Sequence, residues 1–320
     1  MSPRKPRIGI IGSGAIGGFY GLMLARAGFD VHFLLRSEYA VVREQGLKLE
    51  SALHGDVQIA VQAYASAADM PPCDWLLVGA KATSNAELAP LIAKAAAADA
   101  KVVLLQNGLG VEEQLRSALP ASLHLLGGLC FICVNRLSPG VIRHQALGAV
   151  NLGYHSGPAD DGGAAIVEEG AALFRAAGVD SQAMGNLAQA RWQKLVWNVP
   201  YNGLSVLLKA STTALMSNPH SRALIQALMA EVVEGARSRG HEMPEGYAEQ
   251  LFAGTEKLPD YWPSMYHDFT EQRPLELDVI YAEPLARARE AGCSMPRMEA
   301  LYQALAFVDQ ANRETSPQAL

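Results

Sequence analysis

Three polar side chains recur every four residues within an otherwise apolar stretch of this 320-residue sequence. Lys194, Asn198 and Asn202 would therefore share one face of a helix. Lysine is rarely buried unless it is paired, yet the surrounding leucine, valine and tryptophan residues indicate that this segment lies inside the protein. A half-buried ammonium beside neutral amides can present a proton and orient a small polar ligand. The alternative is a helix whose lysine extends to solvent while its asparagines cap or turn the chain.

Pro200 lies between the two asparagines of this segment. A proline inside a helix has no N–H to donate, so the carbonyl of Val196 loses its partner and the helix kinks. We expect either a kink that turns this carbonyl toward the same ligand, or the end of the helix.

A second chemical signature follows the first predicted strand, a β-branched run over residues 7–11. This run leads into a glycine motif and then into a helical pattern over residues 19–27, which is the order that the G-x-G-x-x-G motif of dinucleotide-binding proteins requires. We expect the first glycine to make the turn, the second to admit a pyrophosphate and the third to let the helix pack on the strand. The phosphates would bind at the helix N-terminus. The motif consists of Gly12, Ser13, Gly14, Ala15, Ile16 and Gly17.

The end of the second predicted strand, over residues 31–35, selects between the two nicotinamide cofactors. NAD-dependent enzymes usually place an acidic residue there, where it binds the ribose 2′-hydroxyl. This sequence has Arg36 followed by Ser37, and a guanidinium with a hydroxyl suits a 2′-phosphate, so the pattern favours NADP. Glu38 is the competing acid, although Ser37 and Glu38 could equally begin the next helix.

Two further predicted strands also end in polar residues. Residues 75–80 read as a buried strand ending at Lys81, and residues 102–105 as another ending at Asn107. Either residue alone would be typical of a solvated strand end or a turn. Ligands bind at the carboxyl ends of the strands of open parallel sheets, so Arg36, Lys81 and Asn107 together favour a ligand site.

The remaining pattern divides the chain into an α/β half and a helical half. We predict a doubly wound, mainly parallel sheet in a domain of residues 1–184 and an all-helical domain of residues 185–320. The loop over residues 157–163 is rich in glycine and aspartate, and the tail after Asn312 is polar and frayed. The other predicted strands cover residues 47–53 and 56–61 (an antiparallel pair), 123–135, 141–143, 149–152 and 179–184, with a turn at 138–140. The other predicted helices cover residues 87–98, 164–177, 187–208, 222–239, 245–252, 275–291 and 297–310.

Composition excludes several classes of protein. Half of the residues are hydrophobic and 18% are charged, which suits a compact cytoplasmic enzyme. The net charge of −6 argues against nucleic-acid binding, and we find neither a signal peptide nor a membrane-spanning run. We predict no metal site, because Cys130 and Cys133 would lie on opposite faces of a strand and no second pair completes a zinc site. We expect the four cysteines to be free thiols.

A dinucleotide-binding half with Arg36 after its second strand, followed by a helix bearing Lys194, Asn198 and Asn202, resembles the ketopantoate reductase (2-dehydropantoate 2-reductase) family. The resemblance covers nearly the whole chain. It implies a Rossmann-type first domain and reduction of a 2-oxoacid by NADPH, most simply ketopantoate to pantoate in pantothenate biosynthesis. It also implies that Lys194 is the general acid, that the two asparagines bind substrate and that Asn107 contacts both cofactor and substrate.

The resemblance adds residues that spacing alone would not select. A serine followed by methionine, with a glutamate twelve residues beyond the serine, completes the family's site, and this chain has Ser264, Met265 and Glu276 at that spacing. By this resemblance Ser264 binds substrate, Glu276 contributes to catalysis and cofactor binding, and Arg36 and Lys81 contact the NADP phosphate. Without it, Glu276 would be interpreted as a helix-start acid and Ser264 as an N-cap.

Three positions depart from the family's pattern. Pro200 separates the two asparagines, and Thr212 stands where one branch of the family has a further substrate asparagine. The family commonly has Arg-x-Thr-Glu before its glutamate, whereas this chain has Arg273-Pro274-Leu275-Glu276. These differences concern which 2-oxoacid is bound.

In the hypothesis that follows, Lys194 protonates the forming alkoxide while Glu276 orients the ammonium and a ribose hydroxyl. One alternative is a 3-hydroxyacid dehydrogenase, whose family also has a Lys-x-x-x-Asn helix but usually carries a Ser-Gly-Gly loop that we do not find near residues 126–134. The other is a non-catalytic NADPH sensor. We expect a small-molecule 2-oxoacid as partner, with no nucleic acid or membrane, and the sequence leaves a homo-oligomer open.

Overall fold

The structure is a computed structural model that describes residues 5–159 and 163–315. Its contacts divide the chain into two compact units. The first contains residues 1–106 and 111–187, and the second contains residues 107–110 and 188–320. Asn107 therefore belongs with the helices of the second unit, although it directly follows a strand of the first. Residues 160–162 of the predicted glycine-rich loop and residues 316–320 of the predicted frayed tail lie outside the described residues.

Within the described residues, ten strands of the first unit form one mainly parallel sheet. The order along the sheet is β4-β3-β9-β8-β7-β6-β1-β2-β5, and β10 pairs with β9. Only β3 with β4 and β8 with β9 pair antiparallel among the described strands. The strands are β1 (Arg7–Ile11), β2 (Asp30–Leu34), β3 (Leu47–Ser51), β4 (Val57–Ile59), β5 (Gln62–Tyr64), β6 (Cys73–Val78), β7 (Ala96–Leu104), β8 (His124–Ser138), β9 (Val141–Ser156) and β10 (Ala183–Met184).

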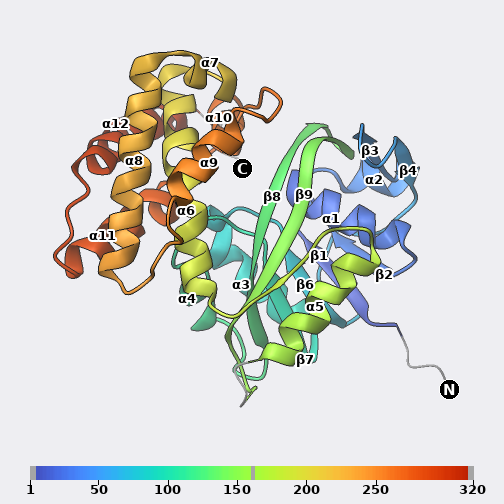
Figure 1. The fold of residues 1–320 in the computed structure, drawn as a ribbon. Coiled ribbons are helices and arrows are strands. Elements are labelled where there is room, and N and C mark those ends of the chain that lie inside the picture. The colour runs from blue at the N-terminus through green and yellow to red at the C-terminus, as the bar shows by residue number, and fades with distance from the viewer. Residues whose placement is uncertain (1–4, 160–162, 316–320) are drawn as a thin grey trace. The chain divides into compact units, whose positions relative to one another are not determined.

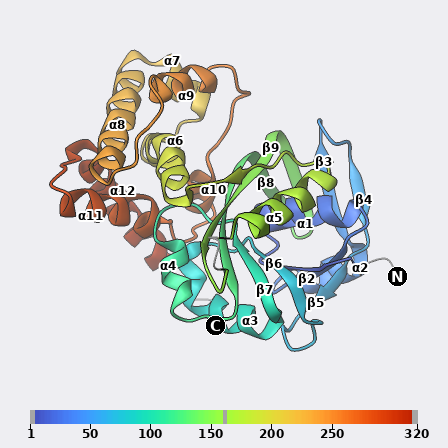
Figure 2. The ribbon, with the colours of Figure 1, turned by 60° about the horizontal axis from the view of Figure 1, so that its bottom comes forward.

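Helices cover both faces of this sheet, as the doubly wound prediction requires (Figures 1 and 2). α1 and α5 contact each other and pack on β8 and β9, whereas α3 and α4 contact each other and pack on β6, β7 and β8. The core lies between the sheet and the helices, with Phe19, Tyr20 and Phe174 among its buried aromatic residues. The helices of this unit are α1 (Ala15–Arg26), α2 (Tyr39–Gln45), η1 (Ala82–Ser84), α3 (Asn85–Ala95), α4 (Val111–Arg116) and α5 (Ala164–Ala176).

Several predicted strand boundaries are wrong. The two strands predicted at 141–143 and 149–152 are parts of the single strand β9, because a bulge at Leu147, with φ of +64°, and Gly148, with φ of +138°, interrupts the alternation without ending the strand. The turn at 138–140 is confirmed, with Gly140 at φ of +75°. The sequence pattern missed β5, and the strand predicted at 179–184 is only the two-residue β10.

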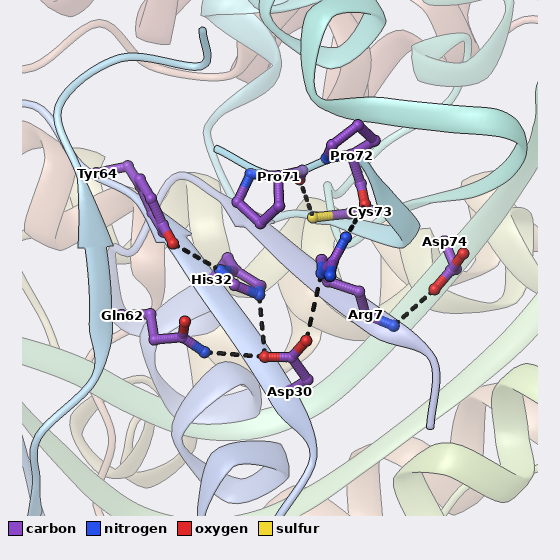
Figure 3. A network of polar contacts seen from close by, with 9 residues as sticks. All are labelled: Arg7, Asp30, His32, Gln62, Tyr64, Pro71, Pro72, Cys73 and Asp74. Carbon is purple, nitrogen blue, oxygen red and sulfur yellow. Dashed lines mark hydrogen bonds and ion pairs between the residues drawn. The ribbon is translucent and has the colours of Figure 1, made fainter. Parts of the chain in front are cut away.

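The amino ends of neighbouring parallel strands are joined by a network of polar contacts (Figure 3). The Arg7 backbone N–H donates to Asp74 Oδ2 at 2.7 Å, and its guanidinium Nε donates to Asp30 Oδ2 at 3.3 Å. His32 Nε2 lies 3.0 Å from Asp30 Oδ1, and its Nδ1 lies 3.0 Å from the Tyr64 hydroxyl. Burial raises the pKa of Asp30, but hydrogen bonding and the nearby charges lower it by more, so its carboxylate stays ionised. This network joins β1, β2, β5 and β6, and it lies at the end of β1 opposite to the end that the glycine turn follows.

A buried histidine joins β3 to β9. His144 and Ser51 are register partners on these strands, and Ser51 Oγ lies 2.9 Å from His144 Nδ1. Since His144 Nε2 lies 3.0 Å from the Leu147 carbonyl oxygen, this nitrogen must be the donor, and Nδ1 of the neutral ring accepts from the serine hydroxyl. Burial lowers the pKa of His144 from its usual 6.5, and the backbone hydrogen bond to Leu147 only partly offsets this effect.

We therefore expect the free energy of unfolding to fall as the pH is lowered below 6.5, the ordinary pKa of histidine. Below this value the unfolded chain takes up a proton that folded His144 resists, so the unfolded state gains stability. Denaturant unfolding of the wild type and of His144→Gln between pH 7 and pH 5 measures the effect. The variant keeps a donor for the Leu147 carbonyl and should show a shallower pH dependence. Equal slopes for the two proteins would contradict this assignment.

The described part of the second unit is helical, as predicted. Helix α6 matches the predicted range and continues through Pro200, so the alternative in which the helix ends there is wrong. The segment predicted as a helix at 275–291 is helical over residues 277–290, but it opens with a short π-helical turn, η2, before the α-helix. The sequence pattern missed α7 and α10. The elements are α6 (Leu187–Leu208), α7 (Thr212–Ser217), α8 (Pro219–Ser238), α9 (Tyr247–Thr255), α10 (Ser264–Thr270), η2 (Asp278–Ala282), α11 (Glu283–Glu290) and α12 (Pro296–Thr315).

Candidate active site

The glycine motif covers the turn between β1 and α1, with Gly12 and Gly14, and the first turn of α1, with Gly17, and the structure gives a different reason for each glycine. Gly12 has φ of +86°, and a Cβ there would lie 2.5 Å from the Ala80 backbone nitrogen. A Cβ on Gly17 would collide with the Gly12 carbonyl oxygen. Gly14, at the N-cap of α1, has φ of −57°, and a Cβ there would meet nothing within 4 Å. Contacts within the protein explain Gly12 and Gly17, whereas the open space at Gly14 fits a phosphate approaching the helix N-terminus.

These contacts predict opposite outcomes for two alanine substitutions. Gly14→Ala should fold as stably as the wild type but bind NADPH about tenfold more weakly or worse, because its methyl group would occupy the space we assign to the phosphate. Gly17→Ala should instead lower the free energy of unfolding by about 1–3 kcal/mol, because its methyl group meets backbone. Thermal unfolding and fluorescence titration with NADPH measure both properties. Unaltered NADPH affinity in Gly14→Ala would show that the space at Gly14 does not serve the phosphate.

The candidate 2′-phosphate residues follow β2. Arg36 is 82% exposed, and its guanidinium lies 3.6 Å from the Glu87 carboxylate, which is itself 73% exposed. Ion pairs this exposed contribute little to stability, so the guanidinium can exchange partners readily. Glu38, the competing acid, is buried at the N-cap of α2, where it pairs with Arg136 and accepts a hydrogen bond from the Gly140 N–H at 3.3 Å. Glu38 is therefore engaged in joining α2 to the β8–β9 turn.

The polar residues after β6 and β7 are positioned by a chain of amides that the sequence analysis missed. Gln106 Nε2 donates to the Ala80 carbonyl at 3.0 Å and to Asn85 Oδ1 at 2.7 Å. Asn85 in turn donates to Gln114 Oε1 at 3.0 Å. Gln106 and Asn85 are both buried. The hydrogen bond from Gln106 holds the backbone of Ala80, and the next residue, Lys81, is the N-cap of η1. The adjacent pair Gln-Asn in the sequence was the available signal for this network.

Helix α6 carries the face that the four-residue spacing predicted. Lys194 is half-buried, whereas Asn198 and Asn202 are buried. Among the described residues, no group hydrogen-bonds to Asn202 Oδ1. A buried acceptor without a partner is costly, and a ligand that donates a hydrogen bond would remove this cost. The face therefore combines a cation with a buried acceptor that suits a hydroxyl.

Glu276 is buried and is held at the start of the π-helical turn. The Leu275 N–H donates to Asp309 Oδ1 of α12 at 2.8 Å, and the Ile280 N–H donates to the Glu276 carbonyl at 3.2 Å. Arg273 adds two contacts to the buried Asp268, from Nε and Nη2, each at 3.0 Å. Contacts on both sides thus hold the backbone that carries Glu276.

Comparison with known proteins identifies the family of this chain. Sequence profiles described as ketopantoate reductase PanE/ApbA and its C-terminal domain match residues 8–157 and 186–309. The chain belongs to the ketopantoate reductase family. A 2-dehydropantoate 2-reductase of Nostoc sp. is 42% identical over 98% of both chains. Two solved structures of 2-dehydropantoate 2-reductases also resemble it. The structure from Geobacter metallireducens is 38% identical, with a TM-score of 0.86, and the match covers 94% of this chain and 99% of the other. The structure from Methylococcus capsulatus is 34% identical, with a TM-score of 0.84, and the match covers 98% of this chain and 99% of the other.

As a member of the ketopantoate reductase family, the chain is an oxidoreductase. Thr212, which replaces the further asparagine of one branch of that family, is buried and pairs with the backbone of Tyr261 through its N–H and its Oγ1, at 2.9 and 3.0 Å. This threonine thus has a structural role. Ser264 is half-buried and is the first residue of α10, whose N-cap is Pro263. The alternative interpretation of Ser264 as an N-cap is wrong.

One further glycine shapes the ketopantoate reductase fold of this chain near the glycine motif. Gly79, which the sequence analysis did not select, follows β6, and a Cβ there would lie 2.7 Å from the Gly17 backbone. This glycine lets α1 lie close to β6. All four cysteines lie in the described part of the chain, and none of them forms a disulfide bond. No helix among the described residues is both long and apolar enough to span a membrane.

Proposed function

We propose that this protein reduces ketopantoate (2-dehydropantoate) to pantoate with NADPH, a step of pantothenate biosynthesis. The observation that carries the proposal is the 42% identity to a protein named 2-dehydropantoate 2-reductase over 98% of both chains. The α6 face supports it, because a 2-oxoacid with a hydroxyl group would supply the donor that Asn202 Oδ1 lacks.

In the proposed mechanism, bound NADPH supplies the hydride that reduces the ketone carbon. Lys194 donates its Nζ proton to the ketone oxygen as negative charge develops there. Asn198, Asn202 and Ser264 hold the carboxylate and hydroxyl of the substrate, and the Lys194 ammonium supplies the compensating charge. Glu276 orients the ammonium and a ribose hydroxyl of the cofactor.

We assign the cofactor residues other than Glu276 to the first 184 residues of the chain and catalysis to residues 185–320, with Asn107 contacting both cofactor and substrate. The turn over Gly12, Ser13, Gly14, Ala15, Ile16 and Gly17 holds the pyrophosphate at the α1 N-terminus. Arg36 and Lys81 hold the 2′-phosphate and so favour NADPH over NADH. The engagement of Glu38 with Arg136 supports this preference, because it leaves Arg36 without a competing acid at the next positions.

NADPH oxidation by the purified protein against a panel of 2-oxoacids, with ketopantoate included, tests the proposal. We expect the highest kcat/KM with ketopantoate, and a loss of activity in Lys194→Ala under the same conditions. Oxidation of 3-hydroxyacids with no reduction of 2-oxoacids would instead indicate a 3-hydroxyacid dehydrogenase. NADPH binding without turnover of any substrate would indicate a sensor. Preference for a different 2-oxoacid would keep the reaction type and correct the substrate.

A further inference from the structure

One short element, the π-helical turn η2, contacts the segments that carry most of the proposed catalytic residues of the second unit. π-helical turns are rare in proteins, and those that occur often lie at functional sites. The contacts of η2 (Asp278–Ala282) reach helix α6 and the segment over residues 107–110, and η2 begins two residues after Glu276. Each contact depends on a different residue of the turn.

The contact with α6 is made by the phenol of Tyr281, which is fully buried. Its hydroxyl donates to the Val199 carbonyl at 2.8 Å, and a Cβ on Gly203 would lie 2.5 Å from the phenol oxygen. Burial raises the pKa of Tyr281 well above its usual value, and a hydrogen bond from the Gly203 backbone only partly offsets this, so the phenol remains a donor. Val199 and Gly203 directly follow Asn198 and Asn202. The phenol thus fixes the part of α6 that carries both asparagines.

This part of α6 has an incomplete set of intrahelical hydrogen bonds. Pro200 donates no hydrogen bond, so the helix lacks one bond of its ladder within the same turn. A side chain that inserts beside the ladder is one of the recognised causes of a local change in helix direction. Tyr281 inserts its hydroxyl there, between the Val199 carbonyl and Gly203.

The contact with the segment over residues 107–110 is made by the backbone of Val279. Its carbonyl accepts a hydrogen bond from the Leu109 N–H at 2.8 Å. Gly108 has φ of +92°, and a Cβ there would lie 2.5 Å from the same carbonyl oxygen. Only glycine therefore allows this approach, and the approach fixes the residue next to Asn107. The same turn continues from Glu276, whose carbonyl accepts from the Ile280 N–H at 3.2 Å.

We propose that the turn η2 sets the positions of Asn107, Glu276 and the two asparagines of α6 relative to one another, and that Tyr281 is the positioning residue through which it acts on α6. The proposal rests on the proposed function for its kinetic consequences. Tyr281 does not touch the substrate in this proposal. It acts through the backbone that carries Asn198 and Asn202.

Tyr281→Phe removes only the hydroxyl, and Tyr201→Phe is its matched control. Tyr201 is equally buried and lies on α6 itself, but its hydroxyl donates to Met216 Sδ at 3.2 Å. We expect Tyr281→Phe to raise the KM for the 2-oxoacid about tenfold, the effect of one lost hydrogen bond, and to leave the Kd for NADPH within about twofold. Tyr201→Phe should leave both constants within about twofold. Equal kinetic constants in the two variants would overturn the proposal, whatever their melting temperatures.

A double-mutant cycle with Gly203→Ala tests the contact itself. Alone, the added methyl group would meet the phenol oxygen and move α6 away from η2, so the KM for the 2-oxoacid should rise. In Gly203→Ala/Tyr281→Phe the methyl group no longer meets the hydroxyl, although the Leu301 side chain still lies 2.8 Å from it, so the KM should rise by less than the product of the two single effects. A KM that equals the product of the two single effects would show that the residues are not coupled, and would overturn the proposal.

Hydrogen exchange separates this proposal from the proposed function. Tyr281→Phe should raise the exchange rates of the Gly203 and Leu109 amides, whereas Tyr201→Phe should leave both unchanged. If the wild type reduces no 2-oxoacid, the proposed function fails, and the exchange rates alone decide whether η2 joins the two segments. Unchanged exchange at Leu109 in Tyr281→Phe would mean that the turn does not couple them.

Discussion

Lys194→Ala should lower kcat for ketopantoate reduction by about 10²- to 10⁴-fold, the range that a positioned general acid contributes. The half-buried ammonium is the group we assign to protonate the forming alkoxide, and its neighbours Asn198 and Asn202 are too weakly acidic to replace it. NADPH affinity should change little, because the glycine turn and Arg36 remain intact. Steady-state kinetics with fluorescence titration of NADPH measure both quantities.

Two further variants separate proton donation from charge. Lys194→Arg keeps the positive charge but holds its proton too firmly to act as an acid near neutral pH, so its kcat should also be low while substrate binding persists. Lys209→Ala, which removes an exposed lysine just after α6, should behave as the wild type. Turnover by Lys194→Ala at the wild-type rate would remove Lys194 from the mechanism.

Arg36→Asp should shift the cofactor preference from NADPH toward NADH. Loss of charge-assisted hydrogen bonds to the 2′-phosphate, together with repulsion from the new carboxylate, should raise the KM for NADPH by about 100-fold, since hydrogen bonds to charged groups contribute about 1.5–3 kcal/mol. The KM for NADH should fall or stay unchanged, because an acid at this position can accept from the ribose 2′-hydroxyl. Glu87, which pairs with Arg36, would then face a second carboxylate and add to the repulsion.

Arg43→Asp is the matched control for this substitution. Arg43 is exposed on α2 and lies over the Tyr39 ring, so its replacement changes the net charge equally in the same region. If both variants lose NADPH affinity by the same factor, the effect is that of overall charge and not of a 2′-phosphate contact. If neither loses affinity, Arg36 does not select the cofactor.

The elements with strong local patterns could be predicted from the sequence. β1 and α6 were predicted to the residue, because a β-branched run before a glycine turn and a long apolar helical period are both unambiguous. Pro200 lies inside α6 without ending it, and the buried Tyr281 hydroxyl donates to the Val199 carbonyl beside it. Tertiary contacts of this kind leave no trace in local sequence.

Other parts of the fold and site could not be predicted for identifiable reasons. A five-residue π turn differs from an α-helix in its hydrogen bonds, which an apolar pattern over so few residues does not reveal, so the pattern predicted one continuous helix over residues 275–291. Asn107 was placed correctly at a strand end, but it belongs to the second unit, where its neighbour Leu109 bonds to Val279, far away in the sequence. The amide chain from Gln106 to Asn85 likewise joins residues distant in sequence.

The polar network of Figure 3 lies at the amino ends of β1 and its neighbours, whereas Gly12 and Arg36 follow the carboxyl ends of β1 and β2. The same strands are therefore joined by polar contacts at their amino ends, whereas the residues that we assign to the cofactor follow their carboxyl ends. Exchanging residues at the carboxyl ends should alter ligand choice with little loss of folding stability, so cofactor preference in such a scaffold can diverge one substitution at a time.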